Sequence, residues 1–161
     1  MPQPIMEEKI TMMKLKLIVT AFGLTLAATA AYAGAADDAI KGRQACMKAH
    51  GASMKIMVPM MKGQAPYDNA AIQATLDAEG PACADWDKWW SADVKDGGTL
   101  KTHAKPEIWS DAKGFADAGG VWFKAYTAVK ASADEAAFKA AFPALGGACG
   151  GCHEKFRTAM E

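Results

Sequence analysis

The residues with the clearest capacity for chemistry lie close to the C-terminus. Cys149 and Cys152 are separated by two glycines and are followed directly by His153, which makes a C-x-x-C-H run. This run is the attachment signature of a covalent c-type haem. Both thiols can reach one edge of a flat macrocycle, and the adjacent imidazole can reach the iron from the same helical turn. The sequence therefore predicts one haem c per chain, attached through Cys149 and Cys152, with His153 as an axial ligand of the iron.

The C-x-x-C spacing also occurs in redox-active dithiols and in zinc sites. A redox-active dithiol is expected beside a βαβ pattern, and a zinc site needs further Cys or His pairs at short spacing. Neither feature accompanies Cys149 and Cys152 in this chain. The haem interpretation is favoured because His153 is part of the haem motif and is optional in the other two.

The N-terminal segment has the features of an export signal. Lys14 and Lys16 supply positive charge, residues 15–30 are mostly apolar, and Ala31-Tyr32-Ala33 is a small-residue site typical of signal cleavage. The apolar stretch is shorter than the ~20 residues of a membrane-spanning helix. We therefore expect a signal peptide at residues 1–33, cleaved near Ala33, and no stable membrane anchor.

Export agrees with the haem motif, because c-type haem is attached outside the cytoplasm. We therefore expect a periplasmic protein whose mature part is residues 34–161. Glu7 and Glu8 are unusual at the start of a signal peptide, so Met12 or Met13 is an alternative first residue.

Length and charge restrict the mature part further. Residues 34–161 are enough for one domain and too few for two. The chain has 18 basic and 18 acidic residues, a balance that gives no sign of a nucleic-acid surface or a polybasic membrane segment. We expect a single cytochrome domain that meets its partners through a local patch, with no nucleic acid among them.

The mature part has a helical pattern almost throughout, since alanine is abundant and turn-forming residues are grouped at intervals. We expect one main helix at about 37–62, a second at 68–79, a third that begins between Pro106 and Asp111 and continues through 129, and a fourth that opens at 132–135 and carries the haem motif. A short helical turn is expected at 86–90 and a polar loop at 93–105. Two short connections and one long one suit an all-α, antiparallel up-down-up-down four-helix bundle, in which a cofactor lies between facing helices.

Local signals set the expected ends of these helices. Asp68 is a candidate N-cap with Ile72 and Leu76 facing inward, and Gly80-Pro81 is expected to interrupt the second helix. Residues 132–135 read as a capping box for the fourth helix, which should kink at Pro143. On the first helix, Ile40, Met47, Met54 and Met61 recur every seven residues, and Arg43, His50 and Met57 lie three positions further on in the same heptads.

Motifs beyond the C-x-x-C-H run resemble the class II c-type cytochromes. This family comprises cytochrome c prime, a standard example of a four-helix bundle whose iron is typically five-coordinate, and low-spin relatives of the c-556 type, whose iron also binds a methionine. The resemblance covers nearly all of the mature part and rests on four stretches: Ala39 to Gln44, Val58 to Tyr67, Ala104 to Asp111 and Cys149 to Arg157.

The resemblance implies a role for Met47. The family residue that faces the distal side of the haem lies four positions after the first-helix arginine, which is Arg43 here. The stretch from Arg43 to Lys48, with Gly51 and Met54, is most similar to the c-556 pattern. A thioether there can bind the iron, and a Met/His pair suits electron transfer. The alternative is that Met47 only packs against the porphyrin, as flexible methionines often do.

Other site residues follow from the same resemblance or from position. The resemblance places Arg43 near a haem propionate, which a guanidinium can pair with, and Arg157 over the proximal face of the haem. Ordinary surface solvation is the alternative for Arg157. His50 lies three residues after Met47 and is expected on a partly exposed shoulder of the helix rather than as an iron ligand. His103 is expected to be an exposed loop histidine.

Two further cysteines, Cys46 and Cys83, form an even pair in an oxidising compartment. They lie at similar distances on either side of the first turn, so antiparallel helices would place them at the same height. We expect a disulfide between them, although the Gly80-Pro81 break weakens this register argument. Two separately buried thiols are the alternative.

Three functions remain open at this level. The favoured one is a periplasmic carrier that passes single electrons through its haem to redox partner proteins. The alternative is a five-coordinate protein that binds nitric oxide or carbon monoxide. A haem peroxidase-type enzyme is disfavoured because His50 is the one obvious acid–base candidate on the distal side, and we expect that the protein is not an enzyme. Pairing of two chains into a homodimer, as in many relatives, is left open.

Overall fold

A computed structural model describes residues 34–159, so the expected signal peptide lies outside the described residues. Within this range the chain is helical, and its only β-type pairing is an isolated bridge between Ala104 and Arg157. The helices are a first helix at 34–61, α2 at Asn69–Ala82, α3 at Trp86–Trp89, a 3₁₀ turn η1 at Ala92–Val94, α4 at Glu107–Ser110, α5 at Ala112–Lys130 and α6 at Glu135–Phe156.

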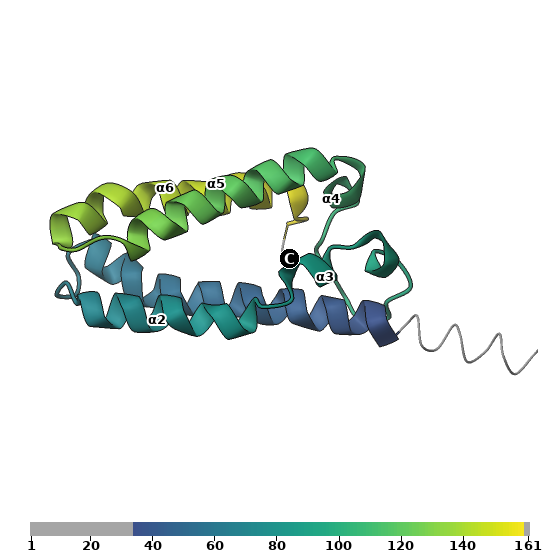
Figure 1. The fold of residues 1–161 in the computed structure, drawn as a ribbon, viewed down its shortest axis with the longest axis horizontal. Helices are drawn as coiled ribbons and strands as arrows, with labels where there is room; N and C mark the ends of the chain where they lie inside the picture. Colours follow the sequence, from purple (N-terminus) through teal and green to yellow (C-terminus); the bar gives the residue numbers. More distant parts are fainter. Residues whose placement is uncertain (1–33, 160–161) are drawn as a thin grey trace, which may run out of the picture.

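The four long helices form the predicted antiparallel bundle. In Figure 1 the first helix and α2 lie side by side along the lower edge, and α5 and α6 lie above them. Short turns at 62–68 and 131–134 join the members of each pair at the left end of the view, and the longer connection passes through α3 and α4 at the right end. None of the helices in the described range combines the length and the apolar character that crossing a membrane would need.

The start of α2 is as predicted, and its end is not. The Asp68 carboxylate accepts a hydrogen bond from the Ala71 backbone N–H at 3.0 Å, and Ile72 and Leu76 are each 1% exposed. The helix passes through Pro81 and ends at Ala82 instead of stopping at Glu79. A proline removes one N–H donor and crowds the carbonyl four residues earlier. The Cys83 N–H still bonds to the Glu79 carbonyl, so the helix ends after the Gly-Pro pair.

The third long helix, α5, begins after Asp111. This residue leaves the helical conformation, with φ −121° and ψ 58°, and its carboxylate accepts a hydrogen bond from the Gly114 N–H at 3.0 Å. Asp111 therefore caps α5 and separates it from the single turn of α4. The predicted start between Pro106 and Asp111 therefore agrees with the structure at its Asp111 limit, and the residues before Asp111 form the separate turn of α4.

The cap of α6 is also different from the prediction. Asp134 accepts the hydrogen bond from the Ala137 N–H at 2.8 Å and is the N-cap. The Ser132 hydroxyl instead donates backward to the Ala128 carbonyl at 3.1 Å. The capping-box prediction was therefore wrong by two residues, because Asp134 is the better acceptor nearer the first turn. Pro143 lies inside α6, which is one helix from end to end.

The apolar core lies between the two short turns and the middle of the bundle. It contains Met57, Met60, Ile72, Leu76, Ala125, Val129, Phe138, Phe142 and Leu145. Met54 and Met61 pack against this cluster, whereas Met47 is half-buried and lies outside it. Of the predicted heptad positions, Ile40, Arg43 and Met57 are buried, whereas Met47, Met54 and Met61 are only partly buried.

The connecting segment, residues 83–105, is attached to the first helix at several points. A disulfide joins Cys46 to Cys83 with a Cα–Cα distance of 4.9 Å. The Asp37 carboxylate accepts hydrogen bonds from the Thr99 hydroxyl and from two backbone N–H groups, and the Gln44 amide donates to the Lys101 carbonyl at 3.0 Å. These links close one end of the bundle and position the aromatic residues of α3.

Candidate haem site

The C-x-x-C-H residues occupy the last turns of α6. Cys149 and Cys152 are free and half-buried, one helical turn apart, and His153 follows directly and is also half-buried. An added Cβ at Gly146, Gly147, Gly150 or Gly151 would meet no atom within 4 Å. No described residue packs closely against α6 at these glycines, so its surface beside the two thiols stays bare.

The surroundings set the protonation of these groups. Burial raises the pKa of the Cys149 thiol, and the nearby Glu79 carboxylate raises it further. Burial also raises the pKa of Cys152, with a contribution from Cys149. These thiols therefore lack the lowered pKa of a redox-active dithiol. For His153, burial and the charges of Arg157 and His50 lower the pKa, which favours the neutral imidazole that binds a metal.

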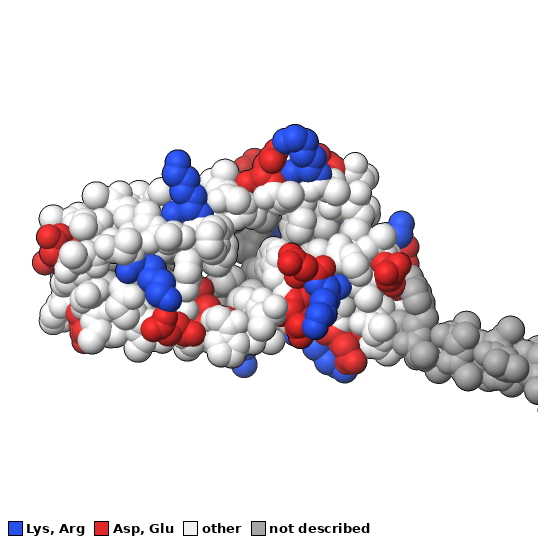
Figure 2. All heavy atoms as spheres, viewed as in Figure 1, with Lys and Arg blue, Asp and Glu red and all other residues white. Residues whose placement is uncertain are grey.

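A cavity of about 550 Å³ lies beside His153, a volume within the range of roughly 300–1,000 Å³ that is usual for ligand sites. Its lining comes from the end of α6, from the residues after it and from the connecting segment: Lys105, Gly150, His153, Glu154, Arg157, Thr158 and Ala159. Figure 2 shows the surface hollowed between the α5–α6 pair and the helices below it, with basic and acidic side chains mixed around the hollow.

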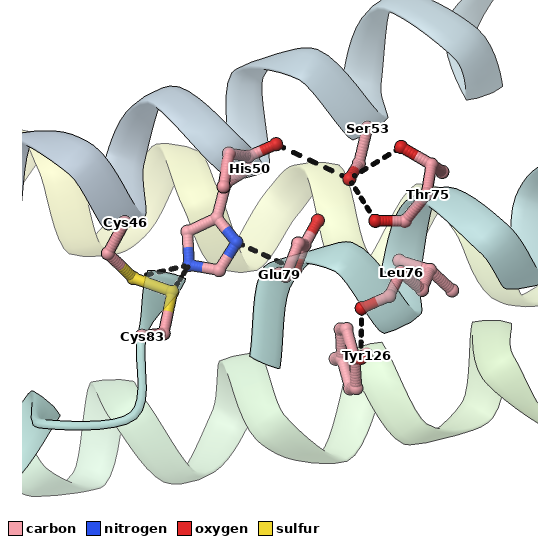
Figure 3. Close-up of polar contacts among 9 residues, drawn as sticks. Cys46, His50, Ser53, Thr75, Leu76, Glu79, Cys83 and Tyr126 are labelled. Carbon is pink, nitrogen blue, oxygen red and sulfur yellow. Dashed lines mark hydrogen bonds and ion pairs between the residues drawn. A yellow bond between two sulfur atoms is a disulfide. The ribbon is translucent and has the colours of Figure 1, made fainter. Parts of the chain in front are cut away.

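A polar cluster joins the first helix to α2 beside the Cys46–Cys83 disulfide (Figure 3). His50 Nδ1 donates to Glu79 Oε2 at 2.8 Å, and both side chains are largely buried, at 17% and 6% exposure. His50 Nε2 lies 3.4 Å from Cys46 Sγ and 3.8 Å from Cys83 Sγ. His50 is thus partly exposed, as the sequence suggested, and it is also bonded to a carboxylate, which the sequence did not predict.

A second, smaller cavity connects this cluster with the haem motif. Its lining includes His50, Met54, Glu79, Trp122 and Cys149. The His50 ring also packs on Trp122, with ring centroids 4.8 Å apart. The turn of the first helix around His50 therefore lies opposite the first cysteine of the motif, as a residue on the distal side of a haem should.

Arg43 is a buried cation one helical turn before Met47. It is 5% exposed, its Nε donates to the Ala39 carbonyl at 3.2 Å, and no described carboxylate pairs with it. Its guanidinium stacks 4.8 Å from the ring centroid of Trp90 and 5.8 Å from that of Trp109. Burial lowers the pKa of Arg43 from a value so high that the group stays charged. A buried guanidinium of this kind requires an anion.

Two buried side-chain atoms lack a hydrogen-bond partner among the described residues, Trp90 Nε1 and the Tyr67 hydroxyl. The Tyr67 hydroxyl has negatively charged neighbours, whereas Trp90 has a positively charged one. Tyr67 lies near Asp134 and Glu135, whose charges, after burial, raise its pKa. Trp90 lies against the Arg43 guanidinium. From the sequence, the size of Trp90 suggested only core or haem-edge packing. Glu79 was not suggested as a site residue, because a carboxylate before a Gly-Pro pair has no characteristic spacing.

The other predicted site residues are placed as follows. Arg157 is half-buried, lines the larger cavity, and pairs through its backbone with Ala104. His103 is partly buried, and its Nδ1 lies 3.1 Å from the Thr158 hydroxyl, so it fastens the loop to the end of the chain. Met47 directly follows the disulfide-bonded Cys46.

This geometry agrees with the comparisons to known proteins. A family model described as Cytochrome C' matches residues 38–157. The chain belongs to the cytochrome c' family. It is 36% identical over 147 residues to a cytochrome c' of Rhodopseudomonas palustris, covering 91% of this chain and 98% of that protein. It is also 32% identical over 146 residues to a cytochrome c-556 of the same organism, covering 89% and 97%.

Solved structures give the same result. Cytochrome c' from Rubrivivax gelatinosus superimposes with a TM-score of 0.68 at 30% identity, covering 76% of this chain and 97% of that one. A nitric oxide complex of a variant cytochrome c prime from Alcaligenes xylosoxidans superimposes with a TM-score of 0.67 at 30% identity, covering 78% and 97%. The predicted family and bundle are confirmed, and the cofactor of this cytochrome c' family member is haem c.

The residues present fit that cofactor. The donor set contains two thiols one turn apart and a neutral imidazole beside them. The buried Arg43 without a carboxylate partner suits the acidic edge of a haem. The bare surface of α6 at its four glycines leaves room for a flat macrocycle.

Proposed function

We propose that this cytochrome c' family member is a periplasmic electron carrier whose haem is attached through Cys149 and Cys152 and whose iron is bound by His153 and Met47. Such a haem supplies a one-electron couple whose potential is raised by Met/His ligation. The chain attaches the group, keeps His153 neutral and shields the site between the first helix and α6. The proposed mature domain is residues 34–161, exported after cleavage of the N-terminal signal segment.

The observation that carries the choice of Met47 is the state of His50. The Glu79 carboxylate can only accept a hydrogen bond, so it fixes the proton on His50 Nδ1, while Nε2 faces the disulfide sulfurs. A histidine whose Nδ1 donates to a carboxylate can still bind a metal through Nε2. Here, however, Cys46 Sγ and Cys83 Sγ lie 3.4 Å and 3.8 Å from His50 Nε2 and occupy the space that an iron would need. Met47 lies three residues away and shares that face of the helix.

Met54 is the competing thioether, and its packing argues against it. Met54 packs against the apolar core, whereas Met47 lies outside that cluster. We expect Met47→Leu to convert a low-spin optical spectrum to a high-spin one and to open the iron to carbon monoxide. Met54→Leu, the matched control, should leave the low-spin spectrum in place. A low-spin spectrum that survives Met47→Leu and disappears in Met54→Leu would assign the ligand to Met54.

Gas binding is the second candidate function, favoured by the solved relative that holds nitric oxide. It requires an iron with an open distal position. A native protein that is already high-spin, binds carbon monoxide readily and is unchanged by Met47→Leu would establish this function in place of electron transfer. Enzyme activity has less support. The acid–base candidate on the distal side is His50, and the disulfide sulfurs 3.4 Å and 3.8 Å from its Nε2 cover the nitrogen that would exchange a proton with a substrate.

The proposed partners are redox proteins of the periplasm, and a second copy of the chain is an additional candidate. Ile56, on the first helix, is 41% exposed, which suits contact between two such helices. Sedimentation at several concentrations tests pairing, and Ile56→Lys should shift any dimer toward monomer.

A further inference from the structure

Trp90 is the one buried donor in the described chain that faces a cation and has no acceptor. Its Nε1 is shielded from solvent and lacks a hydrogen-bond partner, while its ring lies 4.8 Å from the Arg43 guanidinium. An unsatisfied buried N–H is costly, and native structures seldom tolerate one without a function. A donor and a buried cation side by side define a site for an anion.

The environment fixes Trp90 in this position. Its backbone carbonyl accepts the indole N–H of Trp109 at 3.0 Å, and Phe115 packs edge-on against its ring with centroids 4.9 Å apart. The preceding Trp89 lies so close over Gly42 that an added Cβ there would approach its ring to 2.2 Å. Gly42 thus lets α3 dock beside Arg43, and the Cys46–Cys83 disulfide attaches the start of that segment to the same helix.

We propose that the Trp90 indole N–H donates a hydrogen bond to a haem propionate and, with Arg43, forms the binding site for that carboxylate. Arg43 was already expected near a propionate, and Trp90 adds a neutral donor held by α3 rather than by the first helix. The site therefore joins the connecting segment to the cofactor. It depends on the covalent haem and not on whether Met47 binds the iron, so it stands or falls separately from the electron-carrier proposal.

A hydrogen bond to an ionised carboxylate stabilises the charged form and lowers its pKa. Because oxidised iron carries one more positive charge, the propionate pKa is lower in the oxidised protein, and the reduction potential falls with pH between the two pKa values. Trp90→Phe keeps an aromatic ring and removes the donor. We expect the propionate pKa to rise in both the oxidised and the reduced protein. The sloping part of the potential–pH curve should therefore move to higher pH, by about one pH unit.

Trp89→Phe is the matched control, because it makes the same chemical change one residue earlier, where the ring packs on Gly42. We expect it to leave the potential–pH curve unchanged. The propionate bands in the resonance Raman spectrum should shift in Trp90→Phe and stay constant in Trp89→Phe. A Trp90→Phe curve that overlays the native one, or equal shifts in both variants, would overturn the proposal.

The native holoprotein gives a test that does not depend on folding of a variant. Isotope labelling of the indole nitrogens distinguishes the five tryptophans by magnetic resonance in the reduced state. We expect the Trp90 N–H to be protected from hydrogen exchange. Its resonance should also change position across the pH range in which the propionate titrates. Rapid exchange would refute the proposal. A signal that instead follows the concentration of added phosphate would show that a free anion, and not the propionate, is the acceptor.

Discussion

The two ends of the bundle are held together by different interactions. At the end with the short turns, residues from all four long helices form a continuous apolar cluster in which Phe138 is fully buried. At the end with the connecting segment, the contacts are a disulfide, carboxylate hydrogen bonds and a cation stacked on indoles. Both the buried Arg43, which pairs with no described carboxylate, and the Trp90 N–H, which has no acceptor among the described residues, are at this second end.

This difference separates the fold from the function. Apolar burial needs only shape and volume, so the first end can form from the chain alone. The second end buries a charge that the described residues do not neutralise, and such burial is costly without an anion. The haem end should therefore depend on the cofactor for its stability, and the apolar end should not.

The largest effect is expected from the apolar end. Phe138→Ala removes a fully buried ring and should destabilise the protein by about 3–5 kcal/mol. The loss should be similar in the holoprotein and in a haem-free Cys149→Ala/Cys152→Ala form, measured by urea denaturation. A much smaller loss in one of the two forms would show that the ends are not independent.

The disulfide gives the next largest effect, at the haem end. Its cysteines are 37 residues apart, so removing it with Cys46→Ser/Cys83→Ser should cost about 3–4 kcal/mol in the chain-entropy description. Hydrogen exchange should increase mainly in residues 83–105 and little around Phe138. An increase spread evenly over the bundle would contradict the division into two ends.

The sequence predicted the apolar end and the haem motif well. Helical periodicity located Ile72 and Leu76, and Asp68 was identified as a cap, because these are local properties. The prediction from the sequence failed where two possible N-cap residues lie within a few positions, as Ser132 and Asp134 do at the start of α6. It could not find Trp90 or Glu79, because their roles depend on which segments the disulfide and the docking of α3 bring together.

The pair of His50 and Glu79 tests how much a single polar contact contributes at the haem end. Glu79→Gln keeps the shape and removes the charge that His50 Nδ1 donates to. We expect a loss of about 1.5–3 kcal/mol, the usual range for a hydrogen bond to a charged group. Because the Glu79 charge also raises the pKa of Cys149, Glu79→Gln should lower that thiol pKa in the haem-free Cys152→Ala form. Thiol-labelling rates measured against pH would show the change.

The control for this contact alters charge without touching the buried pair. Ala78 is exposed on α2, directly before Glu79, so Ala78→Glu adds a carboxylate at the surface and leaves the His50–Glu79 hydrogen bond in place. We expect its effect on stability to stay within about 0.5 kcal/mol, as is usual at exposed sites. A Glu79→Gln protein as stable as the native one would show that the pair contributes nothing to the haem end.

The smallest effect concerns Asp111, which links the start of α5 to the end of α6. Its carboxylate binds the Lys155 ammonium and caps α5, and these hydrogen bonds hold the pKa of Asp111 below its ordinary value of 3.8. A carboxyl whose pKa is lowered on folding adds stability that is fully present above the unfolded pKa. That stability is lost as the pH falls through the lower, folded value.

Because the Asp111 carboxylate is exposed, salt should weaken its contribution. Native protein should therefore exceed Asp111→Asn in thermal stability at neutral pH, and the difference should shrink as the pH falls below 3.8. Asp117→Asn, which alters an exposed carboxylate paired within α5 alone, is the control. A difference between native protein and Asp111→Asn that stays constant down to the acid limit would show that the Asp111 charge does not connect the two helices.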